Sequence, residues 1–341
     1  MPARLSRLAN RAAETLAIRT GWAKHRFRSS TGQFRVLAYH GLVPDELADR
    51  PWVPPHYVTV SQFERQMNLL AGLGSGTVHP LGEVVNRCQG GGTMDQPVVC
   101  LTFDDGFGDN VSLALPMLRQ YGFLASFFLT TGYMGEDRLL ANDRIRLLRQ
   151  VQRSGRLEGP LSPFMQAVLA HPGFHKQHNH VLLESEIEPL WSTNMEKIDP
   201  AAVRSLRMMS WEDAGCLRDA GMEIGAHTIN HVILGREDLE TRQREITRSV
   251  AEVDARLGLD RVPFSYPNGL AGDFGPDDVS CLQALNVPYA VTELPGCNTP
   301  STSVWGLRRH CVGLHTSEDV FLAQVCGLRD RRLSVPERTI G

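Results

Sequence analysis

Two adjacent carboxylates, Asp104 and Asp105, follow an apolar segment at residues 98–103 and precede Gly106. Such a segment is typical of a buried strand, and the glycine permits a sharp turn directly after it. An Asp-Asp-Gly sequence after a strand is most often a turn or a helix cap. It becomes a candidate site of chemistry when other metal-binding or proton-transferring side chains accompany it.

Two histidines, His227 and His231, supply such side chains directly after a short strand expected at residues 223–226. Their separation of four residues brings both imidazoles to one face if the segment turns helically. Two histidines and one carboxylate, with open positions left for water, are what a catalytic zinc-type site requires. A divalent ion there lowers the pKa of its water to about 7, so hydroxide is available at neutral pH. The pattern therefore predicts a hydrolytic metal site.

The bulk composition narrows the class of protein further. The formal net charge of −3 gives no reason to expect nucleic acid as a partner. The seven cysteines are odd in number and contain no CxxC pair, which favours reduced thiols over disulfides or a zinc–thiolate site. No apolar run is long enough for a secretory signal or a membrane span, so we expect a cytoplasmic protein.

Short apolar segments alternate with amphipathic helical patterns, which predicts an α/β fold with a parallel sheet, most naturally closed as a barrel. Ser61 with Glu64 has the spacing of a helix N-cap and its acidic partner. Ser210 with Asp213 has the same spacing, and Gly258 lies where a helix should end. The expected strands cover residues 34–39, 98–103, 124–130, 223–226, 263–266 and 288–291, and the expected helices cover residues 61–73, 111–121, 210–220 and 237–257.

Residues 135–209 interrupt this alternation and are too many for a connecting loop. They carry a helical pattern of their own, so we expect an inserted, mainly helical subdomain. It leaves from the carboxyl end of a strand, which is the active-site face of α/β barrels. The predicted organisation is an arm at 1–33, a catalytic domain at 34–134 and 210–327, the insertion at 135–209 and a tail at 328–341.

The N-terminal arm is strongly basic and amphipathic, with apolar residues at helical spacing. Its only acidic residue is Glu14, and its basic residues are Arg4, Arg7, Arg11, Arg19, Lys24, Arg26 and Arg28. Packing of this helix on the protein's own body is one interpretation. Peripheral contact with an anionic membrane surface, or with a partner, is the other.

Two motifs give these observations a family context. The sequences Leu101-Thr102-Phe103-Asp104-Asp105-Gly106 and His227-Thr228-Ile229-Asn230-His231 resemble the two signature motifs of polysaccharide deacetylases. This is the NodB homology fold of carbohydrate esterase family 4, and the similarity runs from about residue 34 to 327 apart from the insertion. It implies a distorted (β/α) barrel.

The resemblance also implies roles for individual residues. Asp105, His227 and His231 would bind a divalent metal, most often zinc, with cobalt or nickel as alternatives. Asp104 would be the general base, since a carboxylate beside a ligand can reach the attacking water without itself binding the metal.

A segment containing Tyr266, Pro267 and Asn268 matches the family's oxyanion loop. The backbone N–H of Asn268 is the implied oxyanion donor, because proline has none, and Tyr266 is a further candidate for substrate contact. Many family members carry an arginine where this chain has Ser265, so another residue must orient the base. Arg309, which resembles an arginine found late in related chains, is the candidate.

The proton for the departing amine has several candidate donors. His40, directly after the first strand, resembles the histidine that supplies it in the exopolysaccharide-modifying branch of the family, although a structural hydrogen bond would also explain this residue. His315 and His310 are alternatives, but the carboxylate partner found in other branches is missing. A further cluster inside the insertion is expected to be a solvated polar loop. It contains His171, His175, His178 and His180.

Three functions follow from these patterns. The first is removal of N-acetyl groups from amino-sugar units of an oligosaccharide, polysaccharide or glycan precursor. The second is hydrolysis of another C–N bond, such as a formamide, in a small molecule, because the motifs do not fix the substrate. The third is carbohydrate binding without turnover, which the complete set of Asp104, Asp105, His227 and His231 argues against.

Overall fold

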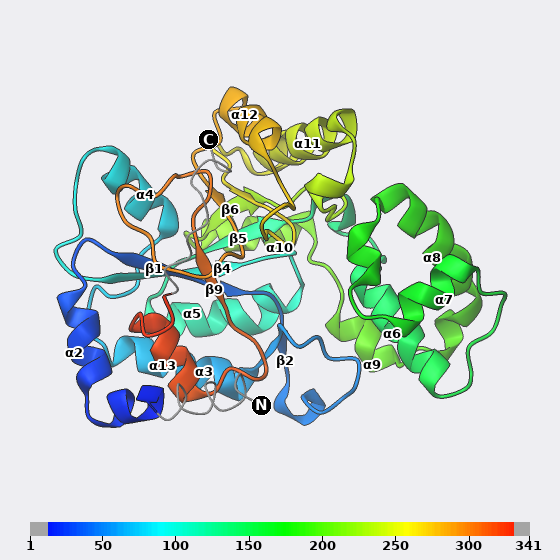
Figure 1. The fold of residues 1–341 in the computed structure, drawn as a ribbon, viewed down its shortest axis with the longest axis horizontal. Helices are drawn as coiled ribbons and strands as arrows, with labels where there is room; N and C mark the ends of the chain where they lie inside the picture. Colours follow the sequence, from blue (N-terminus) through cyan, green and yellow to red (C-terminus); the bar gives the residue numbers. More distant parts are fainter. Residues whose placement is uncertain (1–12, 331–341) are drawn as a thin grey trace.

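The computed structural model describes residues 13–330. Its centre is a seven-stranded, all-parallel sheet in the order β8-β7-β6-β5-β4-β1-β9 (Figure 1). A bridge between Val291 and Leu307 links the two edges, so the sheet forms a nearly closed barrel and confirms the predicted α/β class. The strands are β1 (Phe34–Tyr39), β4 (Val98–Phe103), β5 (Ala125–Leu129), β6 (Glu223–Ala226), β7 (Phe264–Ser265), β8 (Ala290–Val291) and β9 (Arg309–Cys311). A separate pair consists of β2 (Leu42–Val43) and β3 (Val58–Thr59).

The barrel strands are buried on both faces, which explains their continuous apolar sequences. Every residue of β1, β4 and β5 is buried. On one face, stacked rings of Tyr39, Phe103 and Phe127 join the core under the surrounding helices. Alternate residues on the other face, such as Val36 and Cys100, form a second core.

Eight helices with described bounds surround the barrel. Helix α10 begins with the predicted capping box of Ser210 and Asp213, and α11 ends at Gly258 with φ 64°. The N-cap prediction for α3 is wrong: Thr59 caps this helix together with Gln62, because Thr59 still has the extended backbone that an N-cap needs. The helices are α2 (Trp22–Ser29), α3 (Val60–Ala71), α4 (Leu81–Gln89), α5 (Leu115–Tyr121), α10 (Trp211–Asp219), α11 (Leu239–Leu257), α12 (Pro276–Ala284) and α13 (Glu318–Val325).

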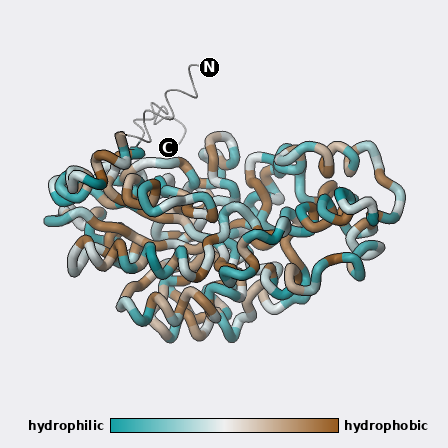
Figure 2. The backbone as a smooth tube through the Cα atoms, turned by 90° about the horizontal axis from the view of Figure 1, so that it is seen from below, coloured by the Kyte–Doolittle hydropathy of each residue, from teal (hydrophilic) through white to brown (hydrophobic). Residues whose placement is uncertain are grey.

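Residues 135–209 form a helical lobe beside the barrel, on the right of Figure 1. Their apolar side chains share one core with Trp52, Tyr57 and Tyr133 of the barrel part. Buried Arg144 pairs with Glu184 across two of the helices. The helices are α6 (Ala141–Arg153), α7 (Pro163–Ala170), α8 (His180–Asn194) and α9 (Pro200–Ser205). Apolar and polar segments alternate along the helices in Figure 2, as expected for amphipathic helices.

The described part of the N-terminal arm packs on the protein's own body. Phe27 of α2 is buried in the main core, Thr15 donates a hydrogen bond to Asp319 at 2.7 Å, and Arg329 pairs with Glu14 at 2.6 Å. Residues 1–12, which carry Arg4, Arg7 and Arg11, lie outside the described residues, so membrane contact stays a prediction. No helix within residues 13–330 has the length and apolar character that crossing a lipid bilayer requires.

Candidate metal centre and catalytic cavity

The two predicted motifs meet at the carboxyl ends of β4 and β6. Asp105 follows β4 with φ 75°, and His231 lies in the turn after β6 with φ 56°. These left-handed conformations are uncommon for residues with side chains and concentrate at functional sites. The backbone thus departs from regular strand geometry where the candidate ligands are placed.

Asp105, His227 and His231 form a compact group whose nearest ligand atoms all lie within 4.8 Å of one another. Asp105 Oδ1 is 3.4 Å from His227 Nε2 and 3.0 Å from His231 Nε2. Tetrahedral zinc with ligands at about 2.1 Å separates them by about 3.4 Å, so the spacing fits such an ion. Asp105 Oδ1 is also buried without a hydrogen-bond partner.

The orientation of His227 supports the same interpretation. Its Nδ1–H donates to the Ser265 carbonyl oxygen at 2.7 Å. That hydrogen bond leaves the Nε2 lone pair facing Asp105, which is how the environment of a metal-bound histidine normally fixes its ring. These three residues could therefore hold a divalent metal.

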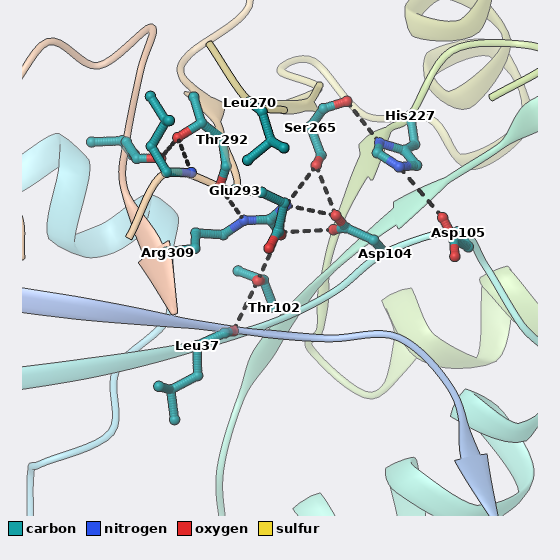
Figure 3. Close-up of polar contacts among 12 residues, drawn as sticks. Leu37, Thr102, Asp104, Asp105, His227, Ser265, Leu270, Thr292, Glu293 and Arg309 are labelled. Carbon is teal, nitrogen blue, oxygen red and sulfur yellow. Dashed lines mark hydrogen bonds and ion pairs between the residues drawn. The ribbon is translucent and has the colours of Figure 1, made fainter. Parts of the chain in front are cut away.

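Asp104 points away from this group into a buried polar network (Figure 3). Arg309 donates to both of its oxygens, from Nη1 at 2.8 Å and from Nη2 at 2.6 Å. Ser265 Oγ donates to Asp104 Oδ2 at 3.0 Å. Arg309 is itself fixed, because Nε donates to the Thr292 carbonyl at 2.8 Å and Nη1 to Thr102 Oγ1 at 3.0 Å. The structure therefore brings the predicted Arg309 to Asp104.

A second carboxylate at this site, Glu293, was missed in the sequence analysis because it belongs to no recognisable motif. Its Oε1 lies 2.7 Å from Arg309 Nη2. Burial raises the pKa of Glu293, although Arg309 opposes the shift. Burial also acts against ionisation of Asp104, but there Arg309 outweighs it and lowers the pKa to about 2. Asp104 is thus the carboxylate that Arg309 keeps ionised.

The candidate metal ligands and the two neighbouring carboxylates line one cavity of about 400 Å³ between the barrel and the insertion, whereas Arg309 and Ser265 lie behind its wall. Asp104, Asp105, His227, His231 and Glu293 form the barrel side. The insertion contributes Leu140, Ala141, Asn142, Asp143, His175, Lys176, His178, His180 and Leu183. The cavity is within the size range of small-ligand sites, about 300–1,000 Å³.

His40 and Asn268 also line this cavity. His40 Nδ1 is buried without a partner, and its ring centroid is 4.6 Å from that of His56. Asn268 has φ 60°. Its backbone N–H donates no hydrogen bond to another described residue.

Three of the candidate residues do not reach the cavity. His310 is paired instead with Asp330, at 3.1 Å, and His315 is exposed outside the cavity lining. Tyr266 is buried in the apolar core, where its hydroxyl donates to the Trp305 carbonyl at 3.1 Å. The suggestions that His310 or His315 donates a proton and that Tyr266 contacts substrate are therefore not supported by the geometry.

The insertion histidines also differ from the expected solvated loop. His175, His178 and His180 line the cavity, whereas His171 is exposed. Within the part of the chain that the structure describes, the only metal-capable group found is that of Asp105, His227 and His231. The polar sequence of this loop predicts exposure to solvent and does not indicate that the loop faces the barrel.

The sequence profile described as "Polysaccharide deacetylase" matches residues 91–280, more than half of the chain. The chain belongs to the polysaccharide deacetylase family. This deacetylase is thus a hydrolase acting on carbon–nitrogen bonds other than peptide bonds, and the retention of Asp104, Asp105, His227 and His231 agrees with membership. A search of curated proteins found no significant match.

Solved structures share the deacetylase fold at low sequence identity. The deacetylase PplD from Streptococcus pyogenes, solved with acetate, is 18% identical with a TM-score of 0.57, and the match covers 87% of this chain and 99% of that one. IcaB from Ammonifex degensii is 17% identical with a TM-score of 0.55, covering 87% and 98%. A de-N-acetylase from Aggregatibacter actinomycetemcomitans is 14% identical with a TM-score of 0.59, covering 86% and 99%. At these identities the comparison establishes the fold.

Proposed function

We propose that this polysaccharide deacetylase removes N-acetyl groups from amino-sugar units of an oligosaccharide, polysaccharide or glycan precursor in a metal-dependent reaction. The observation that carries the proposal is the joint placement of a metal-capable group and a separately held carboxylate in one cavity. Asp105, His227 and His231 form the first, and Asp104 on Arg309 is the second. A metal-dependent hydrolysis with a separate general base needs both a Lewis acid and a base that the Lewis acid does not occupy.

Asp105, His227 and His231 would hold the ion, and zinc suits two imidazoles and one carboxylate best, with cobalt or nickel as alternatives. When bound, the ion supplies Lewis acidity for the acetamide carbonyl and a nucleophile at neutral pH. The Ser265 carbonyl keeps the His227 ring in the orientation that this binding requires.

The remaining steps are assigned to side chains and one backbone amide of the cavity. Asp104 accepts a proton from the attacking water, and Arg309 fixes the direction in which its carboxylate faces. The Asn268 N–H donates to the oxygen on which negative charge develops. His40 donates a proton to the departing amine, a role supported by its unpartnered Nδ1 and its place in the cavity. The proton taken at one side of the substrate is thus balanced by one given at the other.

The cavity also bears on the substrate. Its volume of about 400 Å³ is in the range of small-ligand sites, and the insertion forms one wall, so the reacting unit of the substrate would lie between the barrel and the insertion. Deformylation or another small-molecule amide hydrolysis uses the same groups and is the alternative. Carbohydrate binding without turnover is disfavoured, because binding alone would not need the Arg309-held carboxylate.

The test is product analysis on a panel of substrates. Purified protein is incubated with N-acetylated oligosaccharides of increasing length and with formamide substrates, with and without a chelator. We expect acetate release with loss of one acetyl mass from the glycan, abolished by chelator and restored by zinc. Formate release alone would favour the alternative, and turnover that resists chelator would refute the mechanism.

A further inference from the structure

A lysine of the insertion reaches the loop proposed to supply the oxyanion donor. Lys176 lies in a short 3₁₀ segment, Phe174–Gln177, at the edge of the cavity. Its Nζ donates to the Asn268 side-chain carbonyl, Oδ1, at 2.5 Å. The two residues are 92 positions apart, so this contact exists only because the insertion is docked against the barrel.

The contact belongs to a closed ring of four residues. Asn268 Nδ2 donates to Asp273 Oδ2 at 2.5 Å, and Arg236 Nη2 donates to Asp273 Oδ1 at 3.4 Å. Arg236 Nε returns to the start of the ring by donating to the Lys176 carbonyl at 3.2 Å. Both ends of the Asn268 side chain are therefore held, one by the insertion and the other by its own loop.

The backbone at Asn268 explains why such a ring matters. Its φ of 60° is left-handed, a conformation that is unfavourable for most residues and less so for asparagine. A side chain fixed at both ends opposes relaxation of this backbone. The same conformation sets the direction of the Asn268 N–H, which has no acceptor among the described residues.

One further contact joins the insertion to the same region, and one close approach lies within the barrel part. The His180 N–H donates to Glu237 Oε1 at 2.6 Å. Gly235, just before the ring residue Arg236, lies so close to the loop that an added Cβ would be 2.3 Å from the Gly272 carbonyl oxygen. The loop therefore has little room to shift while the insertion stays docked.

We propose that Lys176 is a positioning residue, and that docking of the insertion through it fixes the Asn268 amide in the direction that oxyanion stabilisation requires. This inference rests on the proposed function for its catalytic consequence, but the structural linkage stands by itself. Lys176 would act through Asn268 rather than by contacting the reacting atoms. The insertion would then be a working part of the catalytic site as well as a wall of the cavity.

The experiment compares Lys176→Met and Lys176→Arg with the control Lys197→Met. Lys197 is also in the insertion, but it pairs with Glu158 and does not line the cavity. Arg236→Met opens the ring at a second position. Amide hydrogen exchange on the metal-free proteins is the first readout, because the Leu270 N–H is bonded to Asp273 Oδ2 and the Gly235 N–H to the Asp273 carbonyl.

We expect faster exchange at residues 268–273 in Lys176→Met and Arg236→Met, and wild-type exchange in Lys176→Arg and Lys197→Met. With substrate, kcat of Lys176→Met should fall about tenfold, since a misdirected donor loses part of the 10²–10³-fold that such donors supply. KM should change less than twofold.

Unchanged exchange would overturn the linkage, and a raised KM with normal kcat would make Lys176 a substrate contact. Absence of deacetylation by the wild type would refute the proposed function while leaving the exchange result valid.

Discussion

Arg309 donates two parallel hydrogen bonds of 2.8 and 2.6 Å to Asp104, although the two residues are 205 positions apart in the chain. Both side chains are almost fully buried. A planar guanidinium matches a carboxylate in this bidentate way, whereas a lysine ammonium does not. The pair therefore fixes the plane of the carboxylate as well as its charge.

Changing Arg309 to Lys should lower kcat by about 10²-fold with little change in KM. The positive charge is kept, but lysine cannot make both hydrogen bonds that Arg309 makes to the carboxylate, which then turns away from the attacking water. Small misplacements have effects of this size. Steady-state kinetics on an N-acetylated oligosaccharide measures the effect. Arg308→Lys, at the neighbouring position, is the matched control, and equal activity of both variants would contradict the assigned role.

Substitution of the proposed base should lower kcat without loss of zinc, whereas substitution of a metal ligand should remove the zinc itself. Asp104→Asn should bind one zinc ion per chain and lose roughly 10²–10⁴-fold in kcat, the usual contribution of a general base. His227→Ala should lose zinc, because one of three ligands is removed. Elemental analysis after dialysis, beside kinetics, checks both. Asp104→Asn with full activity, or His227→Ala with full zinc content, would contradict the division of roles.

Local sequence patterns reveal one part of this site and miss another. Asp105, His227 and His231 follow recognisable strands, and parallel strands bring their carboxyl ends to one face of a barrel, so their proximity was predictable. Tyr266 was misjudged because neighbours on a strand point to opposite faces. Ser265 faces Asp104, and Tyr266 therefore faces the core.

Other features depend on contacts that no local pattern encodes. Glu293 follows the two-residue strand β8 and belongs to no motif, so only the barrel closure brings it to Arg309. The cluster with His175, His178 and His180 is expected to be solvated, because its polarity is all that the sequence shows. Docking of the insertion turns this polar stretch toward the cavity.

His40→Ala should reduce kcat far more than His315→Ala. His40 lines the cavity beside the proposed base and metal ligands, whereas His315 is exposed outside it. Loss of a general acid costs about 10²–10⁴-fold, and an exposed histidine away from the cavity should cost less than twofold. A substrate with a better leaving amine should restore part of the rate of His40→Ala, because such an amine needs less protonation. A larger loss in His315→Ala would overturn this assignment.

Asp143 should destabilise the folded protein at neutral pH. This cavity-lining aspartate of α6 is 2% exposed, and its ion pair with Arg146 is long, at 3.7 Å. Burial raises its pKa from 3.8 to about 6, only partly opposed by Arg146. The folded state therefore holds the Asp143 proton more tightly than the unfolded state, so stability is lost as pH rises between these two values.

Asp143→Asn should gain about 3 kcal/mol of stability over the wild type across this range, with no further gain above pH 7. Chemical denaturation at several pH values measures the difference, with exposed Asp137→Asn as the control. A pH-independent difference would mean that Asp143 stays ionised in the fold.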